Sequence, residues 1–514
     1  MTDTVESAGV RRAAAVARRS EAPLSENLLG HVVGLVVAMC GVGICVGGIV
    51  DAIDGGPDTT PMLITGIVAT VAGSVAWRST AVPARIARLD VFTTVTTSWL
   101  AMALVGAVPY LVTGTLTNVI DALFESVAGF TTTGSTVLRP IEDASAGILF
   151  WRAITQWLGG MGVIVLVVAV LPTVGVGGMD LLQAEAPGPT GERLTPRVNQ
   201  TARRLWALYL GLTIVLAVAY WLAGMSLYDA AAHSLTTVST GGFSNHSAPI
   251  AYFQSAVIEW IAIVGMFLAG CSFTLMYKLI RGNPRPLLRS AEFRTYCTIV
   301  LVAIVAVFIT ADGAGYGTEG FRQATFTVVA IVTTTGYGLA DYGLWSQAAQ
   351  AIVLILMPLG AMAGSTAGGV KMIRVLAVAS VAHRESLRQL HPRMIRPVRI
   401  GDVVLDDQLA NKVLGFLVLA LAAFGGTGLI FALSGADLIT AFSGAATLFG
   451  NVGPGLGEVG PTSDFLNISP FARLVGIGAM LLGRLEIYPI LLALVALPLH
   501  RPRNALRRIV RPLR

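Results

Sequence analysis

The chain has 514 residues, of which 54% are hydrophobic and 12% are charged, and its mean hydropathy is +0.73. A soluble globular protein carries about 25% charged residues, and several apolar runs here exceed the roughly 18 residues that cross a bilayer. The composition therefore excludes a soluble globular protein and predicts an all-α polytopic membrane protein embedded in the lipid bilayer. The net charge of +6 does not indicate nucleic-acid binding, because the basic residues are concentrated in particular loops.

The chain offers little for enzyme chemistry. Its four cysteines and six histidines form no C-x-x-C pair and no metal-ligand spacing. A membrane-embedded enzyme would need His, Asp, Glu or Cys side chains grouped within the apolar segments, and the sequence contains no such group. We therefore expect no enzymatic activity and no organic cofactor.

In chain order, a polar and charged stretch at 1–26 predicts a tail rather than a cleavable signal peptide. Two hydrophobic segments within 27–80 predict an N-terminal transmembrane hairpin. Each of four further units is predicted to contain an outer helix, a short half-helix, a polar loop and a second spanning helix. These pore repeats are predicted at 88–175, 198–282, 291–378 and 406–499, and a basic tail follows at 500–514. The expected fold is thus a two-helix hairpin plus four pseudo-symmetric helix–pore loop–helix repeats around one pore.

The second helix of each repeat is expected to be a single span, and these helices are placed near 148–172, 254–279, 347–376 and 471–498. The chain then crosses the membrane about ten times. With ten crossings every cluster of Arg and Lys falls on one side, which the positive-inside rule assigns to the cytoplasm. We therefore expect a multi-pass protein of the plasma (cytoplasmic) membrane, with both termini in the cytoplasm.

Each repeat carries a polar loop, rich in Gly and in most cases Thr, directly after its short half-helix. These loops are 129–136, 237–243, 332–338 and 450–455. Four such loops at membrane depth can present rings of backbone carbonyls to a dehydrated cation. The C-terminal dipole ends of the half-helices favour a positive charge at the same place. We interpret the loops as the selectivity filter of a pore whose transported substrate is potassium.

The loops and several further motifs resemble the Trk/Ktr/HKT superfamily of potassium transporters, and most closely its bacterial TrkH-type branch. The further motifs lie at 124–126, 150–152, 156–162, 184–189, 194–197, 364–366 and 482–486. The resemblance covers about residues 25–500 and implies the potassium uptake subunit of a Trk-type system, forming a homodimer with one pore per subunit. It also implies a cytosolic nucleotide-binding regulatory partner of the TrkA type, docked on the basic inside loops.

By the same resemblance, potassium is coordinated at each filter glycine and the two residues before it. These residues are Thr132, Thr133, Gly134, Ser239, Thr240, Gly241, Thr334, Thr335, Gly336, Asn451, Val452 and Gly453. Repeat four departs from the pattern, because Asn451 and Val452 replace the usual Ser or Thr, although backbone carbonyls can still complete the ring. Glycine at all four aligned positions favours potassium over sodium.

Two features of the second helices point to control of the pore. Arg484 lies midway along an apolar segment, where a charge is a functional hypothesis by default. The resemblance implies a positive charge below the filter that tunes ion passage, and the alternative is a structural pairing with a buried acid or with carbonyls. The Pro- and Gly-rich stretch 358–369 interrupts the second helix of repeat three. The resemblance implies a gating loop there, with Gly364, Gly368 and Gly369, and the alternative is a packing kink.

Other functions stay open at this point. A sodium-permeable channel or transporter of the same superfamily is the nearest alternative. A secondary transporter of another fold, with inverted repeats and broken helices, is less favoured because the repeats here share one orientation. The sequence does not decide between a channel and transport coupled to protons or sodium.

Overall fold

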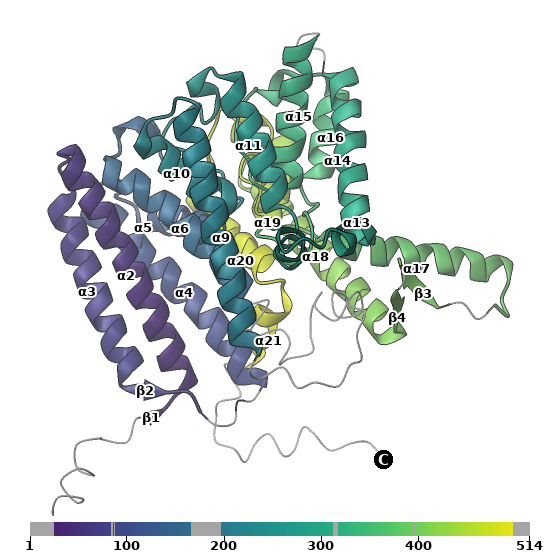
Figure 1. Ribbon diagram of the computed structural model, residues 1–514, viewed down its shortest axis with the longest axis horizontal. Coiled ribbons are helices and arrows are strands. Elements are labelled where there is room, and N and C mark those ends of the chain that lie inside the picture. The colour runs from purple at the N-terminus through teal and green to yellow at the C-terminus, as the bar shows by residue number, and fades with distance from the viewer. Residues whose placement is uncertain are drawn as a thin grey trace, which may run out of the picture.

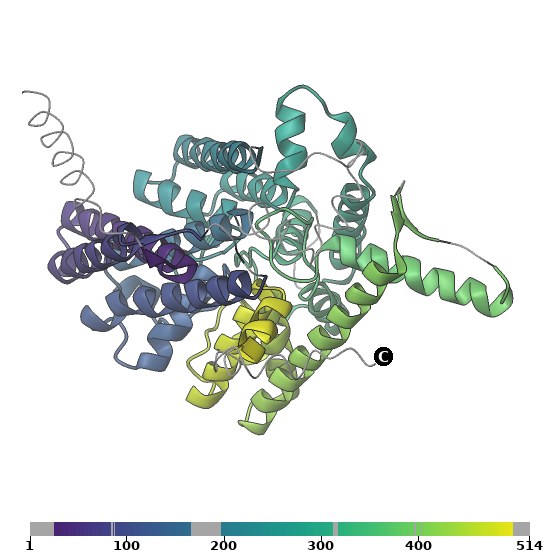
Figure 2. The ribbon, with the colours of Figure 1, turned by 90° about the horizontal axis from the view of Figure 1, so that it is seen from below.

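The computed structural model describes residues 25–83, 86, 88–165, 197–311, 317–394, 397–401 and 403–496. Helices make up most of the molecule (Figure 1), and the chain passes around a common centre from purple through teal and green to yellow (Figure 2). The expected tails, except for Ser25 and Glu26, and the expected end of repeat one at 166–175 lie outside the described residues.

The predicted N-terminal hairpin is present, and a short parallel strand pair closes its base. Its elements are β1 (Ser25–Glu26), α2 (Leu28–Asp54), α3 (Thr59–Arg78) and β2 (Thr80–Ala81). Small residues let the helices approach closely, since a Cβ on Gly73 would lie 2.4 Å from the backbone nitrogen of Ala38. Asp51 is fully buried and accepts a hydrogen bond from the backbone N–H of Gly147 at 3.2 Å, which fixes the hairpin against repeat one.

The same order of elements then occurs four times. Repeat one consists of α4 (Arg88–Val112), α5 (Val119–Phe130), η1 (Ile141–Asp143) and α6 (Ala146–Val165). Repeat two consists of α9 (Arg197–Leu222), α10 (Leu227–Val238), η3 (Ala251–Phe253), α11 (Ala256–Ala269) and α12 (Phe273–Ile280). Repeat three consists of α14 (Ala291–Thr310), α15 (Thr318–Val332), η4 (Tyr342–Leu344), α16 (Gln347–Leu356) and α17 (Met372–Leu390). Repeat four consists of α18 (Asp407–Leu433), α19 (Leu438–Gly450), η5 (Gly457–Val459), α20 (Pro470–Arg484) and α21 (Tyr488–Ala496).

Short elements connect the later repeats. Helix α13 (Arg285–Arg289) joins repeats two and three, and the antiparallel strands β3 (Val398–Ile400) and β4 (Val403–Leu405) join repeats three and four. Helix α17 and these strands project away from the rest of the molecule (Figure 1).

The expectation of continuous second helices was wrong in repeats two and four. Helices α11 and α12 meet at 106° around 270–272, and α20 and α21 meet at 116° around 485–487. In repeat four, Glu486 and Ile487 both adopt positive φ, 62° and 60°, a conformation that cannot continue a right-handed helix. In repeat three the expected interruption is present, and it extends from the end of α16 to the start of α17.

Six of the described helices are long and apolar enough to cross a membrane. The number of spans rises to eight if the bent pairs α11–α12 and α20–α21 are each counted as one span. The ten expected spans would require two more, α6 and the interrupted α16–α17 pair. The number ten therefore stays a prediction.

The pore helices α5, α10, α15 and α19 are only 12, 12, 15 and 13 residues long, against about 20 for a full span. Three of them begin at side chains that accept hydrogen bonds from the first turn. Asn118 accepts from the N–H of Ile120 at 2.8 Å, and Asp437 accepts from the N–H of Ile439 at 3.0 Å. Ser226 caps α10 in the same way.

Two large clusters of buried apolar side chains support this arrangement. One is formed mainly by repeats two and three, and the other joins the hairpin with repeats one and four. The cores therefore cross repeat boundaries, so that no repeat buries its apolar surface alone.

Candidate cation-conduction site

The four filter loops share one backbone conformation. In each loop one residue that is not glycine has a positive φ of 52–58°, and these residues are Thr132, Thr240, Thr334 and Asn451. Each donates its N–H to the carbonyl three residues earlier, and the next residue donates to the carbonyl five residues before itself. A glycine with positive φ follows two residues after each of them, and these glycines are Gly134, Gly242, Gly336 and Gly453.

This geometry corrects the alignment of repeat two by one residue. Gly242, not Gly241, occupies the position of Gly134, and Ser239 ends its pore helix as Thr131 does in repeat one. Gly241 and Gly242 are adjacent, so a match to Thr followed by Gly selects the first of them. Only the backbone shows which one occupies the left-handed region that side chains disfavour.

The four loops close a ring in which each repeat contacts the next. A Cβ built on any of the four positive-φ glycines would lie within 3 Å of a carbonyl oxygen in the following repeat. The separations are 2.2 Å from Gly134 to Gly241, 1.8 Å from Gly242 to Thr335, 1.8 Å from Gly336 to Val452, and 2.9 Å from Gly453 to Thr133. We call the carbonyls of Thr133, Gly241, Thr335 and Val452 the filter carbonyls. They occupy equivalent positions around one centre, which is the arrangement that replaces the water around a bare cation.

The side chains beside the ring differ between repeats. Thr334 accepts a hydrogen bond through Oγ1 from the N–H of Gly368 at 2.7 Å. Asn451 donates through Nδ2 to Thr133 Oγ1 at 2.9 Å and to the carbonyl of Met480 at 3.0 Å, so it bridges repeats four and one. Within the described residues, Thr132 Oγ1 and Asn451 Oδ1 are buried oxygens without a hydrogen-bond partner.

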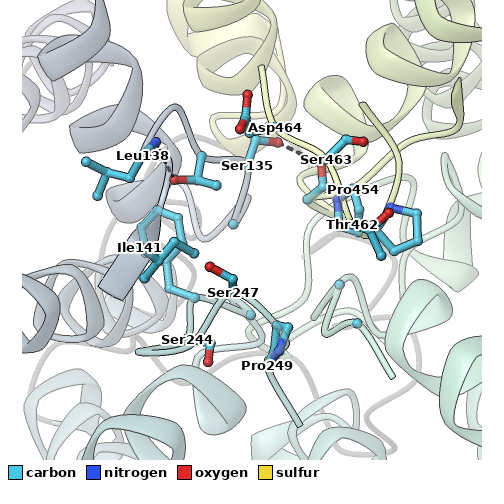
Figure 3. Close-up of a pocket in the computed structure, with 18 of the residues that line it drawn as sticks. Ser135, Leu138, Ile141, Ser244, Ser247, Pro249, Pro454, Thr462, Ser463 and Asp464 are labelled. Carbon is cyan, nitrogen blue, oxygen red and sulfur yellow. Dashed lines mark hydrogen bonds between the residues drawn. The ribbon is translucent and has the colours of Figure 1, made fainter. Parts of the chain in front are cut away.

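A cavity of about 260 Å³ opens on one side of the ring. Its lining includes residues that follow the filter glycines of all four repeats, and Figure 3 shows Ser135, Ser244 and Pro454 from three of them around the opening. Asp464 also lines it, is 5% exposed, and accepts a hydrogen bond from Arg139. Asp464 lies far along the chain from the first filter loop, so no local sequence pattern connects it to this cavity.

Polar contacts between repeats brace the rim of this cavity. Ser247 donates to Glu142 from its N–H at 2.6 Å and from Oγ at 2.5 Å. Partial burial raises the pKa of the Glu142 carboxyl, but the hydrogen bonds from Ser247 outweigh this effect and hold the pKa below its ordinary value. The carboxylate therefore stays ionised and ties repeat one to repeat two.

A buried ion pair lies behind the first filter loop. Arg152 Nε contacts Glu125 Oε1 at 2.8 Å, and both side chains are essentially inaccessible to solvent. Glu125 also accepts from the N–H of Val137 at 2.9 Å, and Arg152 donates to the carbonyl of Ser244 at 2.9 Å. A buried pair needs such additional hydrogen bonds to offset its desolvation. From the sequence, Glu125 and Arg152 were recognised only as members of two separate family motifs, and no pairing between them was predicted.

Residues 357–371 form the expected non-helical loop between α16 and α17. Gly364 and Gly369 have φ of 76° and 65°. The N–H of Gly360 donates to the carbonyl of Val370 at 2.6 Å, which closes the loop at its base. A Cβ on Gly368 would lie 2.6 Å from the carbonyl of Gly450, so the loop packs directly against the filter of repeat four.

Arg484 ends α20 rather than lying midway along a continuous helix. Its side chain is buried and donates to the carbonyl of Thr366 at 2.8 Å and to that of Gly159 at 3.4 Å. Both partners are backbone carbonyls, as in the structural alternative. Glu486, two residues later, pairs instead with Arg374 at 2.6 Å. Arg484 thus contacts the loop at 357–371 while carrying a positive charge beside the filter.

The site is therefore formed by neutral oxygens within a bundle of apolar helices. Among the described residues, no group of three or more His, Cys, Asp or Glu side chains could hold a metal ion. This combination defines a helical membrane protein whose central site suits a weakly held, hard cation.

The comparisons with known proteins agree with that class. The sequence profile of the TrkH family, described as a cation transport protein, matches residues 59–311 and 315–501. The TrkH potassium uptake protein of Vibrio parahaemolyticus is 36% identical over 477 residues, covering 90% of this chain and 97% of that protein. The corresponding protein of Halomonas elongata is 38% identical over 402 residues, covering 76% of this chain and 82% of that one. The chain belongs to the TrkH family.

A solved structure shows the same fold. The crystal structure of the potassium transporter TrkH from Vibrio parahaemolyticus superposes with a TM-score of 0.82 at 34% identity, covering 91% of this chain and 98% of that one. The expected fold class and family resemblance are thereby confirmed.

Proposed function

We propose that this chain is the ion-translocating subunit of a Trk-type potassium uptake system, with potassium as its transported substrate. The observation that carries the proposal is the closed ring of filter carbonyls, each packed against a positive-φ glycine of the neighbouring repeat. Relatives that share at least 36% identity over most of the chain are named potassium uptake proteins. No catalytic step is needed for this function.

In this proposal potassium is coordinated by the filter carbonyls and by oxygens next to them. The coordinating set is the one expected from sequence, with Gly242 taking the place of Gly241 as the positive-φ glycine of repeat two. Gly241 remains in the set through its carbonyl.

We further propose that the loop at 357–371 and Arg484 control passage below the filter. The hydrogen bonds from Gly368 to Thr334 and from Arg484 to Thr366 support this, because they couple the loop to the filter and to the end of α20. Gly364, Gly368 and Gly369 would give the loop the backbone freedom to move.

The assembly is also part of the proposal. We infer a homodimer in the plasma membrane with cytoplasmic termini, regulated by a cytosolic nucleotide-binding subunit of the TrkA type. The protruding α17 with β3 and β4 offers an accessible surface for that subunit (Figure 1), and exposed basic side chains such as Arg388 lie on it.

Growth and flux measurements test the function. Expression in a strain that lacks potassium uptake should restore growth at low potassium. Purified protein in vesicles should carry potassium in preference to sodium. A protein that carries both ions equally would favour the sodium-permeable alternative, and one that carries neither, with its regulatory subunit present, would contradict the proposal.

A further inference from the structure

Gln156 on α6 holds the filter loop of repeat two from both sides of Gly242. Its Nε2 donates to the carbonyl of Gly241 at 2.7 Å, and its Oε1 accepts from the N–H of Phe243 at 3.0 Å. The side chain is fully buried. The N–H of Phe243 can only donate, so it fixes Oε1 as the acceptor and leaves Nε2 as the group that faces Gly241.

This contact makes the filter asymmetric. Among the residues that the structure describes, Gly241 carries the one of the four filter carbonyls that accepts a hydrogen bond, while the carbonyls of Thr133, Thr335 and Val452 accept none. In the wider coordinating set, Ser135 donates to the carbonyl of Gly453 in the neighbouring repeat, and Thr240 donates to that of Ser239 within its own loop. Gln156 belongs to repeat one, so a side chain of one repeat fixes the position of a carbonyl in the next repeat.

A donor on a coordinating carbonyl has two consequences for a cation. The N–H competes for the lone pairs of the oxygen and weakens the field that the oxygen presents. It also holds the carbonyl in place, because moving it breaks a buried hydrogen bond that water cannot replace. Discrimination between potassium and sodium depends on cavity size and on the field strength of the coordinating carbonyls. A weaker field and a fixed position both disfavour the smaller sodium ion.

We propose that Gln156 is a specificity-determining residue of the filter, which it tunes by hydrogen bonding to the carbonyl of Gly241. This inference rests on the proposed filter function. Arg152, one helical turn earlier on α6, bonds to Ser244 in the same loop and lies over the ring of Phe243, so α6 supports the whole loop. Of Arg152 and Gln156, only Gln156 donates a hydrogen bond to a filter carbonyl, that of Gly241.

Two variants separate the role of the donor from that of the support. Gln156→Leu removes both hydrogen bonds, whereas Gln156→Glu keeps an acceptor for Phe243 and replaces the amide donor with a carboxyl, which can donate to Gly241 only while it is protonated. Trp157→Phe is the matched control, because it deletes the hydrogen bond from Trp157 to Thr213 on the adjacent side of the same helix, at 3.2 Å, without touching the filter.

The measurement is the potassium-to-sodium permeability ratio, taken from reversal potentials of reconstituted vesicles under mixed gradients. We expect the ratio to fall by about fivefold in Gln156→Leu, the size of one net hydrogen bond. In Gln156→Glu we expect the same loss when the carboxyl is ionised and a smaller one when it is protonated and donates to Gly241. Trp157→Phe should keep the wild-type ratio.

Unchanged ratios in folded Gln156 variants would overturn the inference while leaving the filter proposal intact. Failure of both variants to fold would assign Gln156 a structural role and would also overturn it. A wild-type protein that does not discriminate between the two ions would instead contradict the proposed function itself.

Discussion

At the scale of single residues, the filter stores backbone strain. Thr132, Thr240, Thr334 and Asn451 adopt positive φ although they carry side chains, and such conformations cost on the order of 1–3 kcal/mol each. They persist because the surrounding hydrogen bonds fix them, including the contacts from Asn451 to repeat one and to α20. The glycine two positions later avoids that cost and leaves room for the neighbouring carbonyl.

The register in repeat two gives a prediction at this scale. Gly242→Ala should lower the potassium-to-sodium permeability ratio more than Gly241→Ala, because its Cβ would lie 1.8 Å from the Thr335 backbone at a φ of 76°. In Gly241→Ala the Cβ would lie 2.3 Å from the amide carbon of Gln156 and would displace that side chain rather than backbone, so we expect a smaller loss of about fivefold. A left-handed residue with a side chain costs about 1–2 kcal/mol, so we expect roughly a tenfold loss for Gly242→Ala. Reversal potentials in vesicles measure this.

Gly425→Ala is the control for that experiment, since nothing lies within 4 Å of the added Cβ. Equal effects at Gly241 and Gly242 would contradict the register assigned to repeat two.

At the scale of elements, the interruptions of the second helices are what bring the control residues together. Helix α20 ends at Arg484, and the turn at 485–487 redirects the chain by 116° into α21. The guanidinium of Arg484 contacts Thr366 in the loop at 357–371, which itself interrupts the second helix of repeat three. A continuous helix would carry the chain straight on past this point.

Neutralising Arg484 should raise potassium flux per folded protein. A fixed charge beside a narrow pore repels a cation, and about 1.4 kcal/mol of repulsion changes occupancy tenfold. Arg484→Gln also weakens the contact that holds the loop at Thr366. We expect an increase of up to about tenfold, measured as isotope flux in vesicles, while Arg484→Lys keeps the charge and most of the barrier.

Arg388→Gln serves as the control in vesicles without the regulatory subunit, because it removes one positive charge from an exposed position on α17. A well-folded Arg484→Gln protein with wild-type or reduced flux would show that the arginine is a structural partner of the two carbonyls and not a barrier.

At the scale of the whole molecule, the hairpin, four repeats and two cross-repeat cores predict a definite orientation in the membrane. Asp54 is exposed at the C-terminal end of α2, and Arg388 is exposed on α17. In the ten-span arrangement these positions face opposite sides. Asp54→Cys should react with a membrane-impermeant maleimide in intact cells, and Arg388→Cys should react only after permeabilisation.

Wild-type protein labelled in parallel is the control, because, of its four native cysteines, Cys40 and Cys271 are buried while Cys45 and Cys297 are partly exposed. Labelling of Arg388→Cys in intact cells would rule out the ten-span arrangement with cytoplasmic basic loops.

The sequence by itself determined the class, the four repeats and the polar loops between them. A long apolar run indicates a segment that is buried in lipid. A loop of Gly and Thr between two such runs indicates non-helical backbone whose N–H and C=O groups need hydrogen-bond partners within the protein. Motif residues extended this to the family, and even the interruption of repeat three was predicted from its Pro and Gly.

Only the tertiary structure decided the register of repeat two, the breaks in α11–α12 and α20–α21, the partners of Arg484 and the contact of Gln156 with Gly241. These features depend on residues far apart in the chain: Asn451 and Thr133 are separated by 318 positions. The sign of φ at Gly242, or at Glu486, follows from where the neighbouring repeats place their carbonyls and side chains. The residues adjacent to Gly242 or Glu486 in the sequence do not determine which distant residues will contact them. Only the folded structure therefore shows how the site is arranged.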